Sequence, residues 1–224
     1  DLHNVDLYAP QAILSVLSLV ASSGTARTLH LKLPPQWAQC SDPEFEKAAM
    51  QYLERFVSLR SLSCHFGFPV PRLIKTLTKR LTCVRSLDLS GCVAGQWIVD
   101  SLSHLAKLPL TELNLSRLSN GVETNPGSAI NGGWRTSSRS ITWPPHLALF
   151  TGLRSLKLAS VRGRWDNVQF FLEHLSRMTR LVELDLRFCF SSQGALKNLT
   201  LLTGLQSLSL ASEAGSGRFH SHSM

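Results

Sequence analysis

The clearest feature of this chain is a recurring alternation of leucine with polar residues, in the pattern L-x-x-L-x-L. In the segment that runs from Val84 to Leu89, Leu87 and Leu89 are separated by one polar residue, so both lie on one face of a short strand. Seven further segments fit the template, and the eight together occupy residues 2–7, 26–31, 59–64, 84–89, 110–115, 153–158, 181–186 and 205–210. The pattern predicts a chain built from repeated strands.

The spacing of these segments indicates the kind of repeat. Successive segments start 24, 33, 25, 26, 43, 28 and 24 residues apart. Five of the seven intervals fall within the roughly 20–29 residues typical of leucine-rich repeats. The copies Leu-Asp-Leu-Ser-Gly-Cys92 and Leu-Asp-Leu-Arg-Phe-Cys189 have Cys where the turn of such a repeat needs a small residue that satisfies backbone groups. The chain resembles the leucine-rich repeat family over residues 2 to about 212, closest to its ribonuclease-inhibitor-like and cysteine-containing (F-box-associated) subtypes.

This resemblance implies an α/β fold: a leucine-rich-repeat solenoid of about eight repeats, with a curved parallel sheet on the concave side and helices on the convex side. Apolar residues at helical spacing predict helices at 10–22, 42–57, 71–81, 97–108, 166–178 and 192–202. We expect one domain over 1–212 and a tail over 213–224. Several copies lack Asn or Cys at the turn position, so irregular turns are expected at Pro10, Pro34, Gly67, Leu118, Val161 and Glu213.

The 43-residue interval contains an insertion, 119–142, that is rich in Gly, Ser, Asn and Thr and breaks both the strand and the helix period. Insertions within one repeat tend to lie on a binding face. Two tryptophans would be unusual in a simple linker, and the partner-binding residues expected here are Trp134, Arg135, Arg139 and Trp143. The alternative is a flexible loop.

Polar positions of the strands predict a basic binding surface. On parallel strands stacked about 4.8 Å apart, equivalent residues form columns across the concave face. The second template position provides Arg27, Arg60, Arg85 and Arg154, and the fifth provides a mixed set that includes Lys157, Asp88 and Asp185. We interpret this face as a site for an acidic protein segment or for phosphates. The alternative is a solvated sheet whose aspartates neutralise the arginines.

The charge balance adds RNA as a second possible partner. The chain has 23 Lys and Arg against 15 Asp and Glu, a net charge of +8, which favours association with nucleic acid or acidic proteins. An outer basic stripe on the helix predicted at 71–81 consists of Arg72, Lys75, Lys79 and Arg80. Such a stripe is also typical of an ordinary solvated helix face. No aromatic residues are interleaved with it, so base stacking has no support.

Motifs for catalysis are absent from the sequence: it contains no G-x-x-x-x-G-K, H-E-x-x-H or G-x-S-x-G. His220 and His222 are too few ligands for a metal site. We therefore expect no enzymatic activity, no cofactor, no metal and no small-molecule substrate.

The cysteines and the apolar runs bear on the compartment. Five cysteines at 40, 64, 83, 92 and 189 form no C-x-x-C pair, which favours free thiols and a reducing intracellular compartment, either cytoplasm or an organelle such as the mitochondrion. The longest apolar run, 12–21, is shorter than the ~20 residues that cross a bilayer, so no membrane span is predicted. Because the chain opens on a repeat strand at Asp1, we expect a preceding segment.

These features favour a non-catalytic protein-interaction module, an adaptor or structural subunit that contacts other protein subunits of a larger complex. A second reading is an accessory subunit of a ribonucleoprotein, for example an organellar ribosome, that contacts RNA phosphates. The family resemblance alone implies a third reading, the substrate receptor of a ubiquitin ligase.

Overall fold

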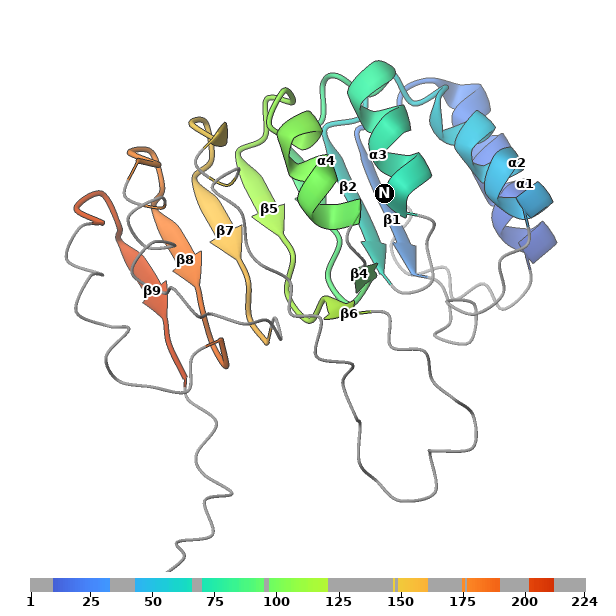
Figure 1. Ribbon diagram of the computed structural model, residues 1–224. Helices are drawn as coiled ribbons and strands as arrows, with labels where there is room; N and C mark the ends of the chain where they lie inside the picture. Colours follow the sequence, from blue (N-terminus) through green and yellow to red (C-terminus); the bar gives the residue numbers. More distant parts are fainter. Residues whose placement is uncertain are drawn as a thin grey trace, which may run out of the picture.

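A single parallel sheet organises the computed structural model, which describes residues 10–32, 43–65, 70–94, 97–120, 147, 149–160, 175, 177–189 and 202–211. Its seven strands lie in the order β1-β2-β3-β5-β7-β8-β9 (Figure 1). They are β1 (Thr28–Lys32), β2 (Ser61–His65), β3 (Ser86–Asp88), β5 (Glu112–Asn114), β7 (Ser155–Lys157), β8 (Glu183–Asp185) and β9 (Ser207–Ser209). Each strand therefore pairs with the next repeat along the chain, as a solenoid requires.

The register of the sheet confirms the repeat template. Every strand pairs parallel with its neighbour, and the fourth template position is aligned throughout, through Leu29, Leu62, Leu87, Leu113, Leu156, Leu184 and Leu208. Seven of the eight predicted segments are strands of this sheet. The eighth, 2–7, lies outside the described residues. The predicted fold class, an α/β solenoid with leucine-rich repeats, is confirmed.

In the described part of the chain, four helices lie along one side of the sheet (Figure 1). They are α1 (Pro10–Ser23), α2 (Pro43–Leu53), α3 (Val70–Lys79) and α4 (Trp97–Leu105). The core lies between them and the sheet, where the apolar residues at the fourth and sixth positions of every strand except β9 are buried together with one face of each helix. Burying each such side chain contributes about 1.5–3 kcal/mol, and stacking the next repeat completes the burial.

Most of the predicted helical faces are buried as expected, but the helix predicted to reach residue 57 ends earlier. Helix α2 stops at Leu53, and the chain then turns through hydrogen bonds from Phe56 N–H to the Leu53 carbonyl and from Leu59 N–H to the Phe56 carbonyl. As a result Phe56 is buried, while Val57, expected on the buried face, is 58% exposed. Of the helices predicted at 166–178 and 192–202, only Leu175, Met178 and Leu202 at the described ends are seen to be buried.

The turns after β3, β5, β7 and β8 are more regular than the sequence predicts. Gly91, Arg117, Ser160 and Phe188 occupy equivalent positions, and each has a positive φ between 56° and 74°. Each of these N–H groups donates to a backbone carbonyl of the next repeat, at Ser116, Ala159, Arg187 and Ala211 respectively. The irregularity expected at Leu118 is therefore wrong, because the conformation of this turn depends on backbone contacts between repeats and not on an Asn or Cys side chain.

The first two residues of the predicted insertion lie in a short strand. Residues 119 and 120 form β6 (Ser119–Asn120), which pairs in parallel with β4 (Val93–Ala94) in a second, two-stranded sheet. Residues 121–142 lie outside the described residues, as does the tail from 212 onward.

Candidate functional site: a column of arginines at the start of the strands

Four arginines predicted to form a column occupy equivalent positions in the structure, one residue before each strand. We call Arg27, Arg60, Arg85 and Arg154 the arginine column. Thr111 takes the same position between Arg85 and Arg154. The backbone fixes the order, because Arg60 N–H donates to the Arg27 carbonyl and Arg85 N–H to the Arg60 carbonyl, both at 2.7 Å. Neighbouring positions are therefore one strand spacing apart, about 4.8 Å.

The column lies at the rim of the sheet where the strands begin, and not within the strands as the sequence suggests. In each repeat the strand starts at the third template position, so the second position precedes it. In an extended strand, a side chain at the second position would point to the same face of the sheet as the buried leucine two residues later. The arginines nevertheless stay in solvent, because Arg27, Arg60, Arg85 and Arg154 are all exposed.

Within the described part of the chain, none of the four guanidinium groups makes a hydrogen bond or an ion pair. Asp185, which was expected to offset them, is instead held by Arg187, whose Nη2 lies 2.7 Å from Asp185 Oδ2. Asp88 Oδ1 accepts a hydrogen bond from Ser90 N–H at 2.8 Å. The carboxylate of Asp185 is therefore already engaged within its own repeat, which leaves the positive charge of the column without that counter-charge.

The third template position, which the sequence reasoning passed over, faces the same side as the fifth. It places the hydroxyls of Thr28, Ser61 and Ser86 directly after the first three arginines of the column. Further along the sheet it places Glu112 and Glu183. The signal was present in the sequence, since alternation about the buried fourth position puts positions three and five on one face.

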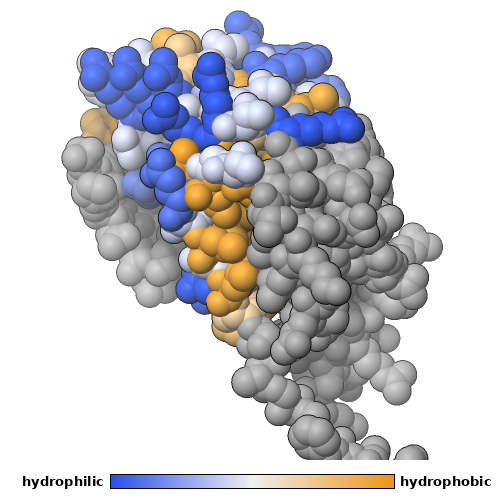
Figure 2. All heavy atoms as spheres, turned by 90° about the vertical axis from the view of Figure 1, so that its left-hand side faces the viewer, coloured by the Kyte–Doolittle hydropathy of each residue, from blue (hydrophilic) through white to orange (hydrophobic). Residues whose placement is uncertain are grey.

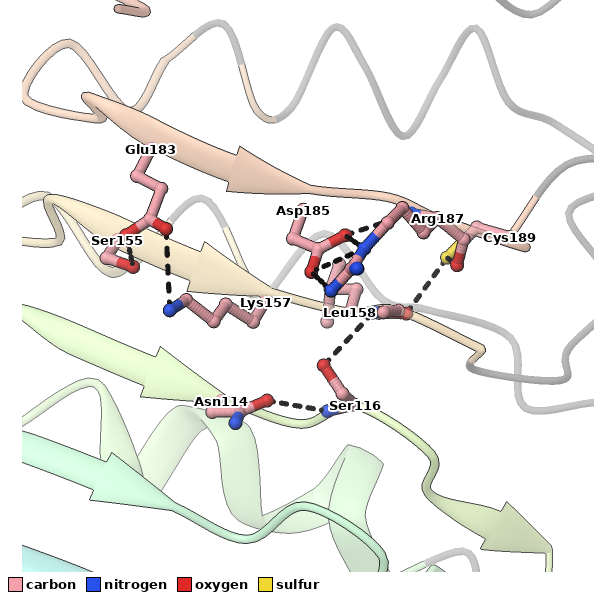
Figure 3. A network of polar contacts seen from close by, with 10 residues as sticks. Asn114, Ser116, Ser155, Lys157, Leu158, Glu183, Asp185, Arg187 and Cys189 are labelled. Carbon is pink, nitrogen blue, oxygen red and sulfur yellow. Dashed lines mark hydrogen bonds and ion pairs between the residues drawn. The ribbon is translucent and has the colours of Figure 1, made fainter. Parts of the chain in front are cut away.

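The far half of the sheet neutralises its own charges (Figure 3). Glu183 accepts a hydrogen bond from Ser155 Oγ at 2.6 Å, and Lys157 Nζ lies 3.4 Å from Glu183 Oε1. The Ser155 hydrogen bond has the largest effect on the pKa of Glu183 and lowers it; burial opposes this, and the charge of Lys157, a smaller effect than burial, lowers the pKa further. Lys157 thus serves as the partner of a carboxylate on the neighbouring strand, and is not part of a free basic surface.

Asp185 lies deeper in the same network and is 6% exposed. Burial raises the pKa of its carboxyl, but hydrogen bonds from the side chain and backbone N–H of Arg187 outweigh burial and hold that pKa below its ordinary value. Arg187 comes from the same repeat, two residues further on. The carboxylates of Glu183 and Asp185 are therefore engaged by neighbouring side chains, whereas the arginines of the column, including Arg154 before β7, have no such partner among the described residues.

The other predicted site residues lie apart from the column. Arg72, Lys75, Lys79 and Arg80 are exposed on or just after α3. They belong to the helical layer, whereas the column belongs to the sheet. The insertion residues Trp134, Arg135, Arg139 and Trp143 lie outside the described residues.

Other chemistry is limited in the described residues. They hold no group of three or more His, Cys, Asp or Glu side chains placed to bind a metal ion. No helix in the described ranges is long and apolar enough to cross a membrane. Burial, followed by the nearby Cys92 and Asp88, raises the pKa of the Cys64 thiol well above its usual range. This thiol is therefore a poor nucleophile.

No family model matches the sequence, and no curated protein matches it. Among solved structures, an internalin from Listeria monocytogenes is 15% identical, with 87% of this chain and 50% of the internalin covered and a TM-score of 0.43. Actin-binding site 2 of leiomodin-1 is 12% identical, with coverages of 85% and 87% and a TM-score of 0.43. A leucine-rich repeat protein from Leptospira interrogans is 14% identical, with coverages of 86% and 38% and a TM-score of 0.39. The chain spans about half the length of the internalin.

Proposed function

We propose that this chain is a non-catalytic protein-interaction module, an adaptor or structural subunit of a larger complex, that binds an acidic protein segment along the arginine column. One observation supports this most strongly. Four exposed guanidinium groups stand at equivalent positions of the solenoid and have no partner among the described residues. Like charges at this spacing repel one another, so an anionic ligand lowers the energy of the surface.

The chemistry of the column suits carboxylates on an extended chain. Guanidinium groups bind carboxylates bidentately, in a geometry that lysine does not offer. Arg27, Arg60 and Arg85 directly precede three successive strands, and the neutral hydroxyls of Thr28, Ser61 and Ser86 follow them. Among these, the hydroxyls of Thr28 and Ser61 can donate to the same ligand without adding charge, whereas the Ser86 hydroxyl already donates to Glu112 Oε2 at 2.8 Å. The preferred partner is therefore a segment with several Asp or Glu residues that runs across the strands.

The test is recovery of partners by co-purification with the native protein, followed by cross-linking mass spectrometry. The quadruple variant Arg27→Glu, Arg60→Glu, Arg85→Glu, Arg154→Glu should lose those partners. A matched control changes the same net charge on the outer stripe, with Arg72→Glu, Lys75→Glu, Lys79→Glu and Arg80→Glu, and should keep them. Unchanged recovery with the column variant would contradict the proposal, and so would equal loss with both variants.

A second candidate function is an accessory subunit of a ribonucleoprotein. The net charge of +8 and the exposed basic residues of α3 favour it. It requires RNA affinity that falls steeply with salt, with a slope that decreases when Lys75 and Lys79 are replaced by Gln. An RNA affinity that does not change with salt would exclude this function.

A further inference from the structure

Strand β9 leaves an apolar edge at one end of the described sheet. Figure 2 shows an apolar stripe down this end of the molecule. Leu208 and Leu210 are 39% and 40% exposed, whereas the equivalent Leu184 and Leu186 of β8 are 0% and 1% exposed. The difference arises because β8 is covered by the next repeat, and no described residue covers β9 in the same way.

The edge also has backbone groups without partners. In β8 the Val182 carbonyl accepts the N–H groups of Gln206 and Ser207, and Leu186 N–H donates to the Ser209 carbonyl. The equivalent groups of the last repeat are the Gln206 carbonyl and the Leu210 N–H, which have no partner among the described residues. Alternate residues of a strand direct their N–H and carbonyl groups to the same edge, so the N–H and carbonyl of Leu208 point to the open edge of β9 as well.

Strand β9 belongs to a repeat that has no charged residue at the second, third and fifth positions. At the second, third and fifth positions every other repeat of the sheet has at least one Arg, Lys, Asp or Glu, but these positions of β9 are Gln206, Ser207 and Ser209. Exposed edge strands are normally protected from pairing by charged residues, proline or a bulge. The described residues of this edge have none of these protections.

We propose that β9 is a homodimer interface, at which a second copy of this chain pairs its own β9 antiparallel about a two-fold axis at Leu208. The outward groups are self-complementary about that residue. Leu208 exchanges both hydrogen bonds with Leu208 of the second copy, and each Leu210 N–H meets the Gln206 carbonyl opposite. Ser207 then lies across from Ser209, so no like charges meet although the whole chain is strongly basic.

Two lysines on this edge test the pairing without disturbing the fold. In Ser207→Lys with Ser209→Lys, the new side chains lie in register with Glu183 and Asp185 of β8, which favours the folded chain. In the dimer the same lysines oppose one another across the axis. Sedimentation analysis over a wide concentration range should show a dimer for the unmodified chain and a monomer for this variant. The control Gln11→Lys with Thr25→Lys, exposed positions beside α1 at the other end of the solenoid, should remain dimeric.

A cross-link distinguishes the two-fold arrangement from other contacts. Hydrogen-bonded antiparallel partners have Cα atoms about 5.5 Å apart, within the range of a disulfide. In a Cys40→Ser, Cys83→Ser background, Leu208→Cys should form a disulfide-linked dimer under mild oxidation, and Leu19→Cys, at a site 75% exposed, should not. A monomeric unmodified chain, a dimeric lysine variant, or equal cross-linking at both cysteines would overturn the proposal. It uses none of the arginine column, so either proposal can fail alone.

Discussion

Cys92 Sγ lies 3.1 Å from the backbone carbonyl oxygen of Cys64 and donates a hydrogen bond to it across two adjacent repeats. Cys189 makes the same contact with the carbonyl of Leu158, at 2.9 Å. Cys64 and Leu158 both occupy the sixth template position of the preceding repeat. The two cysteines thus satisfy backbone groups in the turn, as the sequence predicts for this position.

Removing either of these thiols should destabilise the protein. Cys92→Ala and Cys189→Ala each leave a buried carbonyl with one donor fewer and create a small cavity, so the free energy of unfolding should fall by about 1–3 kcal/mol. Cys83→Ala, at an exposed cysteine, is the control and should have almost no effect. Chemical denaturation measures all three. Equal stability of the Cys92→Ala variant and the control would show that the hydrogen bond contributes nothing.

The same thiols should differ in reactivity. Cys83 is exposed, whereas Cys64, Cys92 and Cys189 are buried, and the pKa of Cys64 is raised by that burial. A thiol-alkylating reagent at neutral pH should therefore modify Cys83 in the native protein and reach the other three only after denaturant is added. Mass spectrometry of peptides from both conditions provides the measurement. Rapid native labelling of Cys64 would contradict the buried position.

Removing a glycine at one turn position and introducing a glycine at an equivalent position should change the free energy of unfolding in opposite directions. Gly91 has φ 74° and Arg117 has φ 56°, a region that costs an ordinary L-residue about 1–2 kcal/mol. Gly91→Ala should lower the free energy of unfolding by about 1 kcal/mol. Arg117→Gly, at an exposed side chain, should raise it by up to about 1 kcal/mol. Thermal denaturation of both variants tests the prediction, and shifts of the same sign would contradict it.

Acid should remove part of the stability that comes from Asp185. Because its pKa is lower in the folded chain than in the unfolded chain, its contribution is complete above about pH 4 and is lost as pH falls through the folded pKa. Arg187→Gln should lower the free energy of unfolding at neutral pH, because it removes the side-chain hydrogen bonds and the charge that hold Asp185 ionised. The difference from the unmodified chain should shrink at about pH 2–3, because Asp185 is then protonated.

A suitable control for this pH dependence is Arg180→Gln, at an exposed arginine with no partner among the described residues. Urea denaturation at both pH values gives the comparison. A difference between Arg187→Gln and the unmodified chain that stays constant with pH would mean that Arg187 acts through packing and not through the carboxylate.

The sequence predicts the sheet well because its repeat depends on local alternation. Leu62, Leu87 and Leu113 are buried and aligned in neighbouring strands. It also predicts the adjacency of Arg27, Arg60 and Arg85, because equal template positions stack. The placement of those arginines before the strands was not predicted, since it depends on the residue at which strand pairing begins.

The repeat pattern also does not predict contacts that depend on the turn after the strand. The template predicts that Asp185 is available to the arginines, but the turn brings Arg187 back over it. The exposure of Val57 has a similar origin, because the end of α2 at Leu53 depends on hydrogen bonds in the following turn. Repeat patterns describe what neighbouring units share, and these features belong to one unit alone.

The pairing of β5 with β7 joins residues much further apart in sequence than the other steps. Ala159 N–H donates to Ser116 Oγ over a separation of 43 residues, whereas Ser86 bonds to Glu112 over 26. Lengthening a closed loop by that amount costs only about 0.5 kcal/mol in chain entropy. Foreign peptides, reporter tags or small folded domains could therefore be grafted between these two strands at little thermodynamic penalty, with the register on either side unchanged.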